Sequence, residues 1–378
     1  MTDTGDMTVP RRRPPTATEP RVLLSRRRLL QLSASGLLLA GCGAVGGESE
    51  PGSTEATWPD PEVSPSAAPT VQPVPETDPE PEDTTVPPVD VQPYTVLPGE
   101  MEPECKTAAV RSLETALTWR DGETGMQAAV DRLAALGITG AATTTLTPAL
   151  VGERWSSLRV TYPQYGGMLP DRSQASVMVT GTQIVPQDGE AKERGLIVDV
   201  RLAKQDGAWT VTEMLLPQRP EPTGPTAAGQ AVIDHDNIIL PDPARRDIEA
   251  RLVDDLVCEL LLTLAETWRL DVQVLNSGHP WDVFMTGRQS NHTKGRAVDL
   301  WALNGIPVID HENSPWREVM EAAVAAGAGQ AGGPEDLDGV RGRRPYFTDA
   351  VHQDHLHLGF TDDQFDPTPT TTAPPVDG

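Results

Sequence analysis

Cysteine, positive charge and long apolar runs are all scarce in this chain of 378 residues. Cys42, Cys105 and Cys258 are isolated, and none belongs to a cysteine-type zinc motif. The 55 acidic residues outnumber the 30 lysines and arginines, so the formal net charge is -25, which argues against nucleic-acid binding. The apolar run that ends at Leu39-Ala-Gly-Cys42 is too short for a transmembrane helix and is typical of a signal peptide.

The N-terminal segment predicts export. Ser25-Arg-Arg-Arg-Leu-Leu-Gln31 fits the twin-arginine pattern, and Leu39-Ala-Gly-Cys42 resembles a bacterial lipobox. That resemblance implies a signal over residues 1–41, cleavage before Cys42 and a diacylglycerol on the Cys42 sulfur. The mature protein would be held by lipid on the outer face of the cytoplasmic membrane, facing the cell wall. The alternative is a plain signal peptide in which Cys42 is incidental.

Residues 42–104 are expected to form a disordered tether. Residues 43–104 hold 14 prolines and 14 acidic residues but no lysine or arginine, and such a composition cannot bury a core. This segment therefore carries more than half of the net charge. A long acidic tether on a twin-arginine lipoprotein resembles exported proteins of actinobacteria.

Residues 105–217 predict a first α+β domain. Helical spacing over 106–120 and 125–136 is followed by strand patterns over 157–162, 175–185, 196–204 and 208–216, and Gln205-Asp-Gly207 predicts a hairpin turn. Helices followed by antiparallel strands resemble the NTF2-like or cystatin-like fold. The segment has no histidine and no clustered catalytic set. Its expected role is binding or spacing.

Residues 218–229 predict a linker, residues 230–362 a second α+β domain, and residues 363–378 a disordered Pro/Thr tail. In the second domain we expect one long helix from Asp242-Pro243 to about Trp268, with Asp242 as its N-cap. A strand over 271–275 and a helix over 314–326, capped by Ser314, should follow. Cys258 lies among leucines on the long helix, where it could be a buried apolar residue or a disulfide partner of Cys105.

Four of the seven histidines lie in two short C-terminal stretches. In Ser290-Asn-His-Thr-Lys-Gly-Arg-Ala-Val-Asp-Leu300, residues 297–301 predict a buried strand with Ala297 and Asp299 on one face. In Val351-His-Gln-Asp-His-Leu-His-Leu-Gly-Phe360, His355 and His357 share one strand face. Imidazoles with one carboxylate are zinc ligands, and His292, Asp299 and His357 would leave a fourth position open, as catalytic zinc requires.

The two stretches together resemble the signature of the LAS metallopeptidases, a group that includes lysostaphin-type endopeptidases, D-alanyl-D-alanine carboxypeptidases and hedgehog-like domains. His352-x-x-His355-x-His357 is most similar to the murein endopeptidase branch. The resemblance covers residues 230–362 and implies a small antiparallel sheet with flanking helices. It also implies zinc ligation by His292, Asp299 and His357, with His355 as base or transition-state partner.

Two departures from that pattern leave roles open. Relatives in the carboxypeptidase branch carry an arginine where this chain has Asn276-Ser-Gly-His-Pro280, so Arg288 or Arg296 is the candidate for a substrate carboxylate. Ser290 and His279 complete the candidate substrate-binding residues. Asp354 occupies the position of a glutamate base in another branch. We favour His355 as base, because Asp354 should point away from it on a regular strand.

The sequence therefore predicts a lipid-anchored zinc metallopeptidase that hydrolyses a peptide bond in peptidoglycan stem peptides or cross-links, as a carboxypeptidase or an endopeptidase. One alternative is a catalytically silent, zinc-containing lipoprotein that binds the cell wall or a partner. Another makes the first domain a ligand-binding module.

Overall fold

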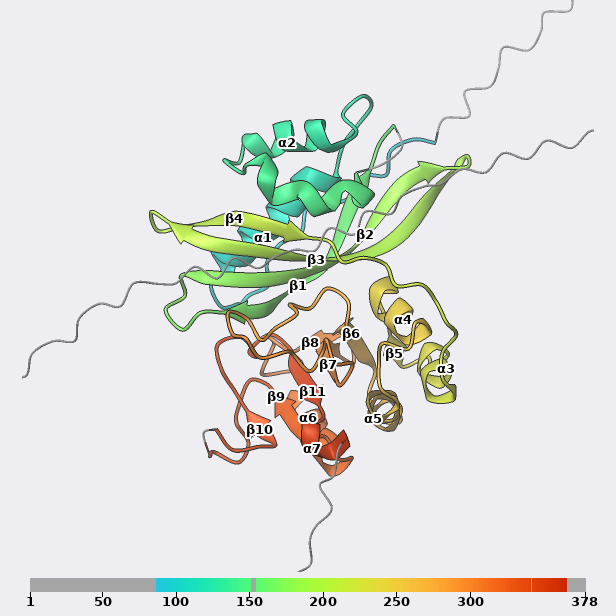
Figure 1. The fold of residues 1–378 in the computed structure, drawn as a ribbon, viewed down its shortest axis with the longest axis vertical. Helices are drawn as coiled ribbons and strands as arrows, with labels where there is room; N and C mark the ends of the chain where they lie inside the picture. The colour runs from blue at the N-terminus through green and yellow to red at the C-terminus, as the bar shows by residue number, and fades with distance from the viewer. Residues whose placement is uncertain (1–85, 151–153, 341, 366–378) are drawn as a thin grey trace, which may run out of the picture. The chain divides into compact units, whose positions relative to one another are not determined.

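The computed structural model of this protein describes residues 86–150, 154–340 and 342–365, and its fold is mixed α+β, as expected (Figure 1). The predicted signal, Cys42 and most of the predicted tether lie outside the described residues. No helix in the described ranges has the length and apolarity needed to cross a membrane. The described residues belong to one compact unit, which contains both predicted domains.

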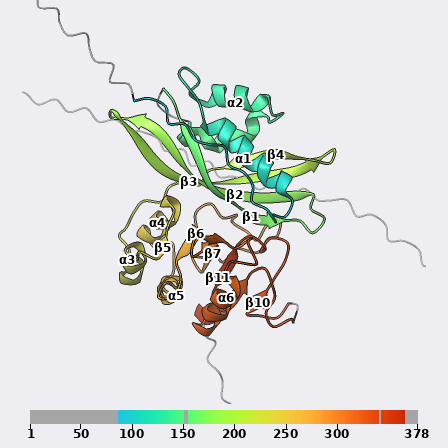
Figure 2. The ribbon, with the colours of Figure 1, turned by 180° about the vertical axis from the view of Figure 1, so that it is seen from behind.

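The first half of this unit is an antiparallel sheet with helices on one face (Figure 2). The strands pair in the order β1-β2-β3-β4. The sheet packs with two α-helices and a 3-10 helix around one hydrophobic core, called the first core below. Asp206 and Gly207 both have positive φ, so the predicted tight hairpin between β3 and β4 is confirmed. The elements are α1 (Pro103–Leu117), α2 (Met126–Ala134), η1 (Gly140–Ala149), β1 (Ser157–Met168), β2 (Gln174–Gln187), β3 (Glu190–Gln205) and β4 (Ala208–Leu215).

The second half is built on a mixed sheet of order β10-β9-β11-β7-β6-β5, with β8 paired to β7. Its central strands are antiparallel, as expected, but β10 pairs with β9 and β5 pairs with β6 in parallel. Leu356 and Leu358 face the helices in a second core, which confirms the predicted alternation. The strands are β5 (Ile238–Ile239), β6 (Leu270–Val274), β7 (Ala297–Leu303), β8 (Ile306–Pro307), β9 (Gln330–Gly332), β10 (Tyr346–Phe347) and β11 (Leu356–Gly359). The helices are α3 (Ala227–Ile233), α4 (Asp242–Glu249), α5 (Asp255–Ala265), α6 (Trp316–Ala325) and α7 (Asp362–Phe365).

The prediction of one long helix from Asp242 to Trp268 is wrong, because α4 and α5 are separate. Arg251 adopts a left-handed φ of 57°, and the Asp254 side chain caps α5 by accepting from Leu256 N. The loop that carries His292 packs against this break, so closely that a Cβ added at Gly295 would lie 2.3 Å from the Leu252 carbonyl oxygen. Asp242 does not cap α4 either, since its Oδ2 accepts from Gly195 N at 2.7 Å. Nor does Ser314 cap α6, which lacks a side-chain cap.

The last part of the predicted tether, residues 86–104, is packed rather than disordered. Trp155 Nε1 donates to the Val86 carbonyl at 2.9 Å, and Tyr94 N donates to Glu114 Oε1 at 2.8 Å. Tyr94 and Met101 pack against the first core. These two apolar side chains and the satisfied backbone groups explain why a proline-rich composition did not keep this stretch extended in solvent.

The two predicted domains meet through a buried interface. Tyr162 of β1 stacks on Trp301 of β7 with ring centroids 4.9 Å apart. Gln273 Nε2 of β6 donates to the carbonyls of Tyr162 at 3.0 Å and Met178 at 3.1 Å, and Thr180 Oγ1 contacts Gln273 Oε1 at 2.9 Å. Because buried polar groups must be paired, these bonds hold the face of the first sheet against the second.

A disulfide between Cys105 and Cys258 is contradicted. Both thiols are free and buried, Cys105 in the first core and Cys258 in the second. They therefore act as small apolar side chains, the other expected role.

Candidate metal centre and its cavity

Three predicted ligands converge at one point. In the pairing of β11 with β7, His357 lies directly opposite Asp299, and the loop before β7 places His292 beside both. His292 Nε2 is 3.0 Å from Asp299 Oδ1 and 3.0 Å from His357 Nδ1, and His357 Nδ1 is 3.1 Å from Asp299 Oδ1. His292 and Asp299 are fully buried. The strand register and the turn at Gly295, which has a positive φ of 74°, produce this arrangement.

His279 belongs to the same cluster. Its imidazole stacks on that of His292 with centroids 4.2 Å apart. One ligand atom each from His279, His292 and Asp299 lies within 4.8 Å of the others, so this group could hold a metal ion. The sequence indicated His279 as a substrate-binding residue and did not place it near a metal.

The donor chemistry fits a cation. His292 Nδ1 lies 2.8 Å from the Leu275 carbonyl, an acceptor, so Nδ1 carries a proton. His292 Nε2 faces Asp299 Oδ1 and His357 Nδ1, an arrangement that calls for a positive charge between these atoms, either a proton on Nε2 or a metal ion. Burial alone would raise the pKa of Asp299, but His292 and His355 lower it well below its ordinary value, so Asp299 is an anion.

The other imidazoles are available as neutral ligands. Burial lowers the pKa of His357 to about 4, against the opposing effect of Asp299. Burial also lowers the pKa of His279 well below its ordinary value. Because a metal binds unprotonated imidazole, both rings are in the required form at neutral pH.

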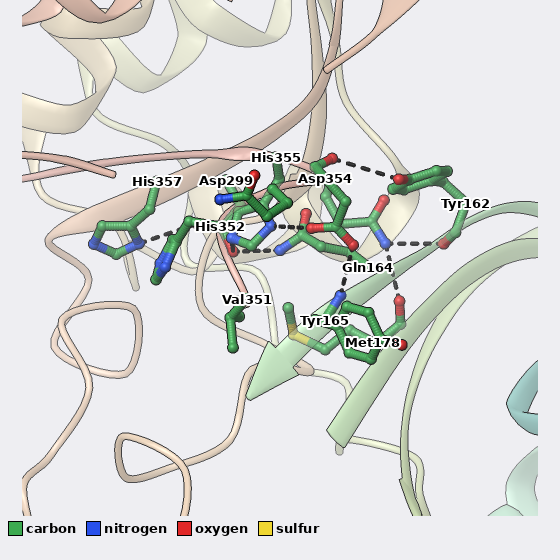
Figure 3. Close-up of polar contacts among 12 residues, drawn as sticks. Tyr162, Gln164, Tyr165, Met178, Asp299, Val351, His352, Asp354, His355 and His357 are labelled. Atoms are coloured by element: carbon green, nitrogen blue, oxygen red, sulfur yellow. Dashed lines mark hydrogen bonds and ion pairs between the residues drawn. The ribbon is translucent and has the colours of Figure 1, made fainter. Parts of the chain in front are cut away.

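Asp354 does not point away from His355, as the sequence analysis expected. β11 begins at Leu356, so Asp354 precedes the regular strand, and its Oδ1 lies 2.6 Å from His355 Nδ1 (Figure 3). This contact places the His355 proton on Nδ1 and leaves Nε2 as an acceptor, 3.8 Å from Asp299 Oδ2. Asp354 therefore contacts the candidate base rather than the cavity.

The first half of the fold supplies the other partners of Asp354. Lys106 Nζ of α1 donates to Asp354 Oδ2 at 2.6 Å, and Tyr165 N of β1 donates to the same oxygen at 3.1 Å. Lys106 also pairs with Glu100, and both its charged partners are buried. Burial would raise the pKa of Asp354, but Lys106 and the His355 contact lower it below its ordinary value.

Glu100 is the weaker partner of that lysine. Burial raises the pKa of Glu100 to about 7, against the lowering effect of Lys106. Close to neutral pH, Glu100 is therefore only partly ionised, whereas Asp354, with its lowered pKa, is an anion beside Lys106. One signal in the sequence could have indicated this lysine, because Lys106 shares the apolar face of its helix with Ala109, Val110 and Leu113.

Gln164 of β1 reaches the metal cluster itself. Its Nε2 donates to Asp299 Oδ2 at 2.6 Å, while its buried Oε1 has no hydrogen-bond partner among the described residues. A glutamine between Pro163 and Tyr165 on a strand gives no local sign of such a contact, so the sequence analysis missed it.

A cavity of about 400 Å³ opens over the cluster. Arg288 and the buried Ser290 line it, in agreement with their predicted place, and His352 lines it as well. Asp349 raises the pKa of His352, although burial alone would lower it. Two arginines that the sequence analysis did not select, Arg343 and Arg344, also line the cavity.

Arg296, the other arginine predicted to bind substrate, is not among the residues that line the cavity. Arg296 Nη1 pairs with Asp362 Oδ1 at 2.7 Å, and its guanidinium lies 3.8 Å from the centroid of the Phe365 ring. It joins β7 to α7 at the edge of the second half.

Comparison of the chain with protein-family models, with curated proteins and with solved structures gives no match. The likeness to LAS metallopeptidases therefore rests on the two histidine motifs.

Proposed function

We propose that the protein is a zinc-dependent hydrolase of peptide bonds in peptidoglycan stem peptides or cross-links. The observation that carries the proposal is the convergence of His292 Nε2, Asp299 Oδ1 and His357 Nδ1 within 3.1 Å, with the His355 Nε2 acceptor beside them. Two imidazoles and one carboxylate match a catalytic zinc site with an open position.

His292, Asp299 and His357 would hold the ion, with His279 as the neighbouring alternative donor. When bound, zinc supplies a Lewis acid that polarises a carbonyl and makes water more acidic. His355 Nε2 accepts the proton of the attacking water, and the Asp354 carboxylate balances the charge that develops on the ring. This is the orienting role that a carboxylate has behind a histidine base.

The cavity supports a peptide substrate with a free carboxylate. Its volume of about 400 Å³ falls within the usual range for small-ligand sites. Arg288, Arg343 and Arg344 line it and supply planar guanidinium groups, which pair well with carboxylates. A stem peptide ends in such a carboxylate. The predicted export signal and lipid anchor would place the protein at the cell wall, where such peptides occur.

Muropeptide digestion tests the proposal. The zinc-loaded full chain is incubated with purified muropeptides, and the products are identified by mass spectrometry. We expect either loss of a terminal D-alanine or cleavage of cross-linked dimers. His355→Ala should bind zinc normally and cleave at least about 100-fold more slowly, as the loss of a general base implies. His235→Ala is the matched control, because His235 does not line the cavity. Unchanged muropeptides with zinc bound to the wild type would contradict the proposal.

A further inference from the structure

The second half of the fold, which carries the histidines, relies on the first half for part of its site. Asp354, beside the candidate base, and Asp299, a candidate metal ligand, each have one carboxylate oxygen that is hydrogen-bonded by residues of the first half. Asp354 Oδ2 accepts from Lys106 Nζ and Tyr165 N. Asp299 Oδ2 accepts from Gln164 Nε2, and Gln164 and Tyr165 are seen beside the two aspartates in Figure 3. These contacts bridge 135 to 248 residues of chain.

We propose that α1 and β1 are working parts of the site: Gln164 positions Asp299 for the metal, and Lys106 positions His355 through Asp354. The Lys106 part rests on the proposed function, since its measure is turnover. The Gln164 part is measured by metal affinity and is independent of turnover.

Stability alone does not explain why the Gln164 amide is buried. Its Oε1 is buried without a partner among the described residues, and an unpaired buried polar group destabilises the folded chain. Within the described part of the chain, the one hydrogen bond of this amide goes to Asp299 Oδ2, at 2.6 Å. Holding Oδ2 in this way leaves Oδ1 directed at His292 and His357, the orientation that a metal at their nitrogens needs. Partners that orient a metal ligand in this way commonly change metal affinity by about 10–100-fold.

Lys106 is similarly placed for the base. The side chain is fully buried, and its amino group bonds both Glu100 and Asp354. A buried ion pair is weak evidence of stabilisation, because apolar residues of similar volume often serve as well. Lys106 instead fixes which Asp354 oxygen remains for His355. With Oδ2 occupied by Lys106 and Tyr165 N, Oδ1 faces His355 Nδ1 at 2.6 Å.

The Gln164 part is tested in the full chain by chelator competition for zinc. Gln164→Leu should raise the zinc dissociation constant about 10–100-fold. Gln183→Leu is the matched control, because Gln183 is also a buried glutamine of the same sheet but bonds Ala149 O and Ser156 Oγ away from the site. It should leave zinc affinity within threefold. Equal affinities for Gln164→Leu and wild type would overturn this part.

The Lys106 part is tested by separating kcat from KM. Lys106→Met should lower kcat, counted per folded and zinc-loaded site, at least tenfold, with KM and zinc affinity unchanged. A purely structural loss would lower the number of such sites and leave kcat per site unchanged. Lys204→Met, which removes an ion pair with Glu102, is the control. If Lys106→Met does not fold, the double variant Glu100→Gln/Lys106→Met removes one carboxylate together with the cation. A wild-type kcat in the folded variant would overturn the role of Lys106.

These outcomes are distinct from failure of the proposed function. A wild type that cleaves no muropeptide, with zinc affinity still lowered by Gln164→Leu, overturns the peptidase activity and supports the shared metal site. An active wild type with both variants unaffected overturns the shared site alone.

A second cavity carries an independent inference. It has a volume of about 410 Å³ and is lined by Arg194 of β3, Arg219 after β4 and Arg246 of α4, and no acidic residue is among the described residues of its lining. Burial lowers the pKa of Arg194 and of Arg219, and a neighbouring arginine lowers each further. The opposing carboxylate near Arg219 is Asp242, whose Oδ2 already accepts from Gly195 N.

Hydrogen bonds fix the position of the Arg194 guanidinium. Its Nε and Nη2 donate to Gln183 Oε1 at 2.9 and 2.7 Å, and Nη2 also donates to the Ala149 carbonyl at 3.1 Å. Guanidinium groups match phosphate oxygens in charge and in geometry. We infer that this cavity binds a phosphate-bearing anion through Arg194, Arg219 and Arg246.

Calorimetry of the metal-free full chain with inorganic phosphate tests this site. We expect saturable binding at low salt that is at least tenfold weaker in Arg219→Gln/Arg246→Gln. It should be unchanged in Arg159→Gln, a control whose side chain pairs with Glu193 outside the cavity. Citrate provides the carboxylate comparison. Tighter binding of citrate than of phosphate, or equal phosphate binding by the double variant and wild type, would overturn the inference.

Discussion

Replacing Asp354 by asparagine should reverse the tautomer of His355. Asp354 Oδ2 accepts from two donors, Lys106 Nζ at 2.6 Å and Tyr165 N at 3.1 Å, and Oδ1 faces His355 Nδ1 at 2.6 Å. Asparagine has one side-chain acceptor, and two fixed donors, one of them charged, will hold it. Its amide NH₂ must then face His355 Nδ1. That ring can accept this bond only with its proton on Nε2, where it can no longer act as a base.

The expected decrease in kcat follows from the loss of general base catalysis. General base catalysis contributes about 10²–10⁴ in rate, so Asp354→Asn should lower kcat by that factor, or about 3–5 kcal/mol in the barrier. Zinc affinity should stay within threefold, because no donor atom of the metal cluster is removed. The assay is kcat on muropeptides with zinc content and melting temperature measured in parallel.

Asp199→Asn is the control for Asp354→Asn. Asp199 is another buried aspartate, bonded to Ser176 and Arg201 in the first sheet, away from the cavity. Its substitution should affect stability without a comparable loss of kcat in the folded protein. If Asp354→Asn, folded and zinc-loaded, retained kcat within threefold of wild type, the assignment of His355 as an oriented base would be refuted.

Three further outcomes are expected. The pKa of His357 in the folded chain, about 4, lies below its ordinary value of 6.5, so the unfolded chain takes up this proton first as pH falls. The free energy of unfolding of the metal-free protein should therefore decrease by up to about 3 kcal/mol between pH 6.5 and pH 4. Denaturant titrations that show no decrease in this window would contradict the prediction. Burial raises the pKa of Cys105 and of Cys258 to about 12, so a thiol reagent at pH 8 should modify them only after unfolding, and rapid labelling of the native chain would be the contrary result. Arg344→Ala should raise KM for a stem peptide at least tenfold whereas Arg296→Ala should not, and a larger effect of Arg296→Ala would show that the wrong arginine was chosen.

Local patterns predicted the parts of the site that lie on regular structure. The alternation around Asp299 is a strand property, and β7 formed as expected. His357 lies on β11, but His355 precedes that strand, so the two histidines do not share a strand face as predicted. The same rule failed at Asp354, because β11 begins two residues later and the bend before it turns the carboxylate back to His355. The prediction depended on where the strand starts, which the alternation itself does not determine.

Long-range contacts account for most of what the sequence could not supply. Lys106 and Gln164 reach residues far along the chain, and nothing in the strand or helix around them predicts which side chain they meet. The break between α4 and α5 also has a tertiary cause: Gly295 and its loop pack against the carbonyl of Leu252, where the leucine pattern predicted a continuous helix.

Zinc stoichiometry in ligand variants tests the central claim most directly. The purified chain, dialysed against zinc and analysed by mass spectrometry of the metal, should bind one ion. His357→Ala and Asp299→Ala should lose it, and His279→Ala should retain it with weakened affinity. A wild type that binds no zinc, or full retention in Asp299→Ala, would contradict the metal centre on which the proposed activity depends.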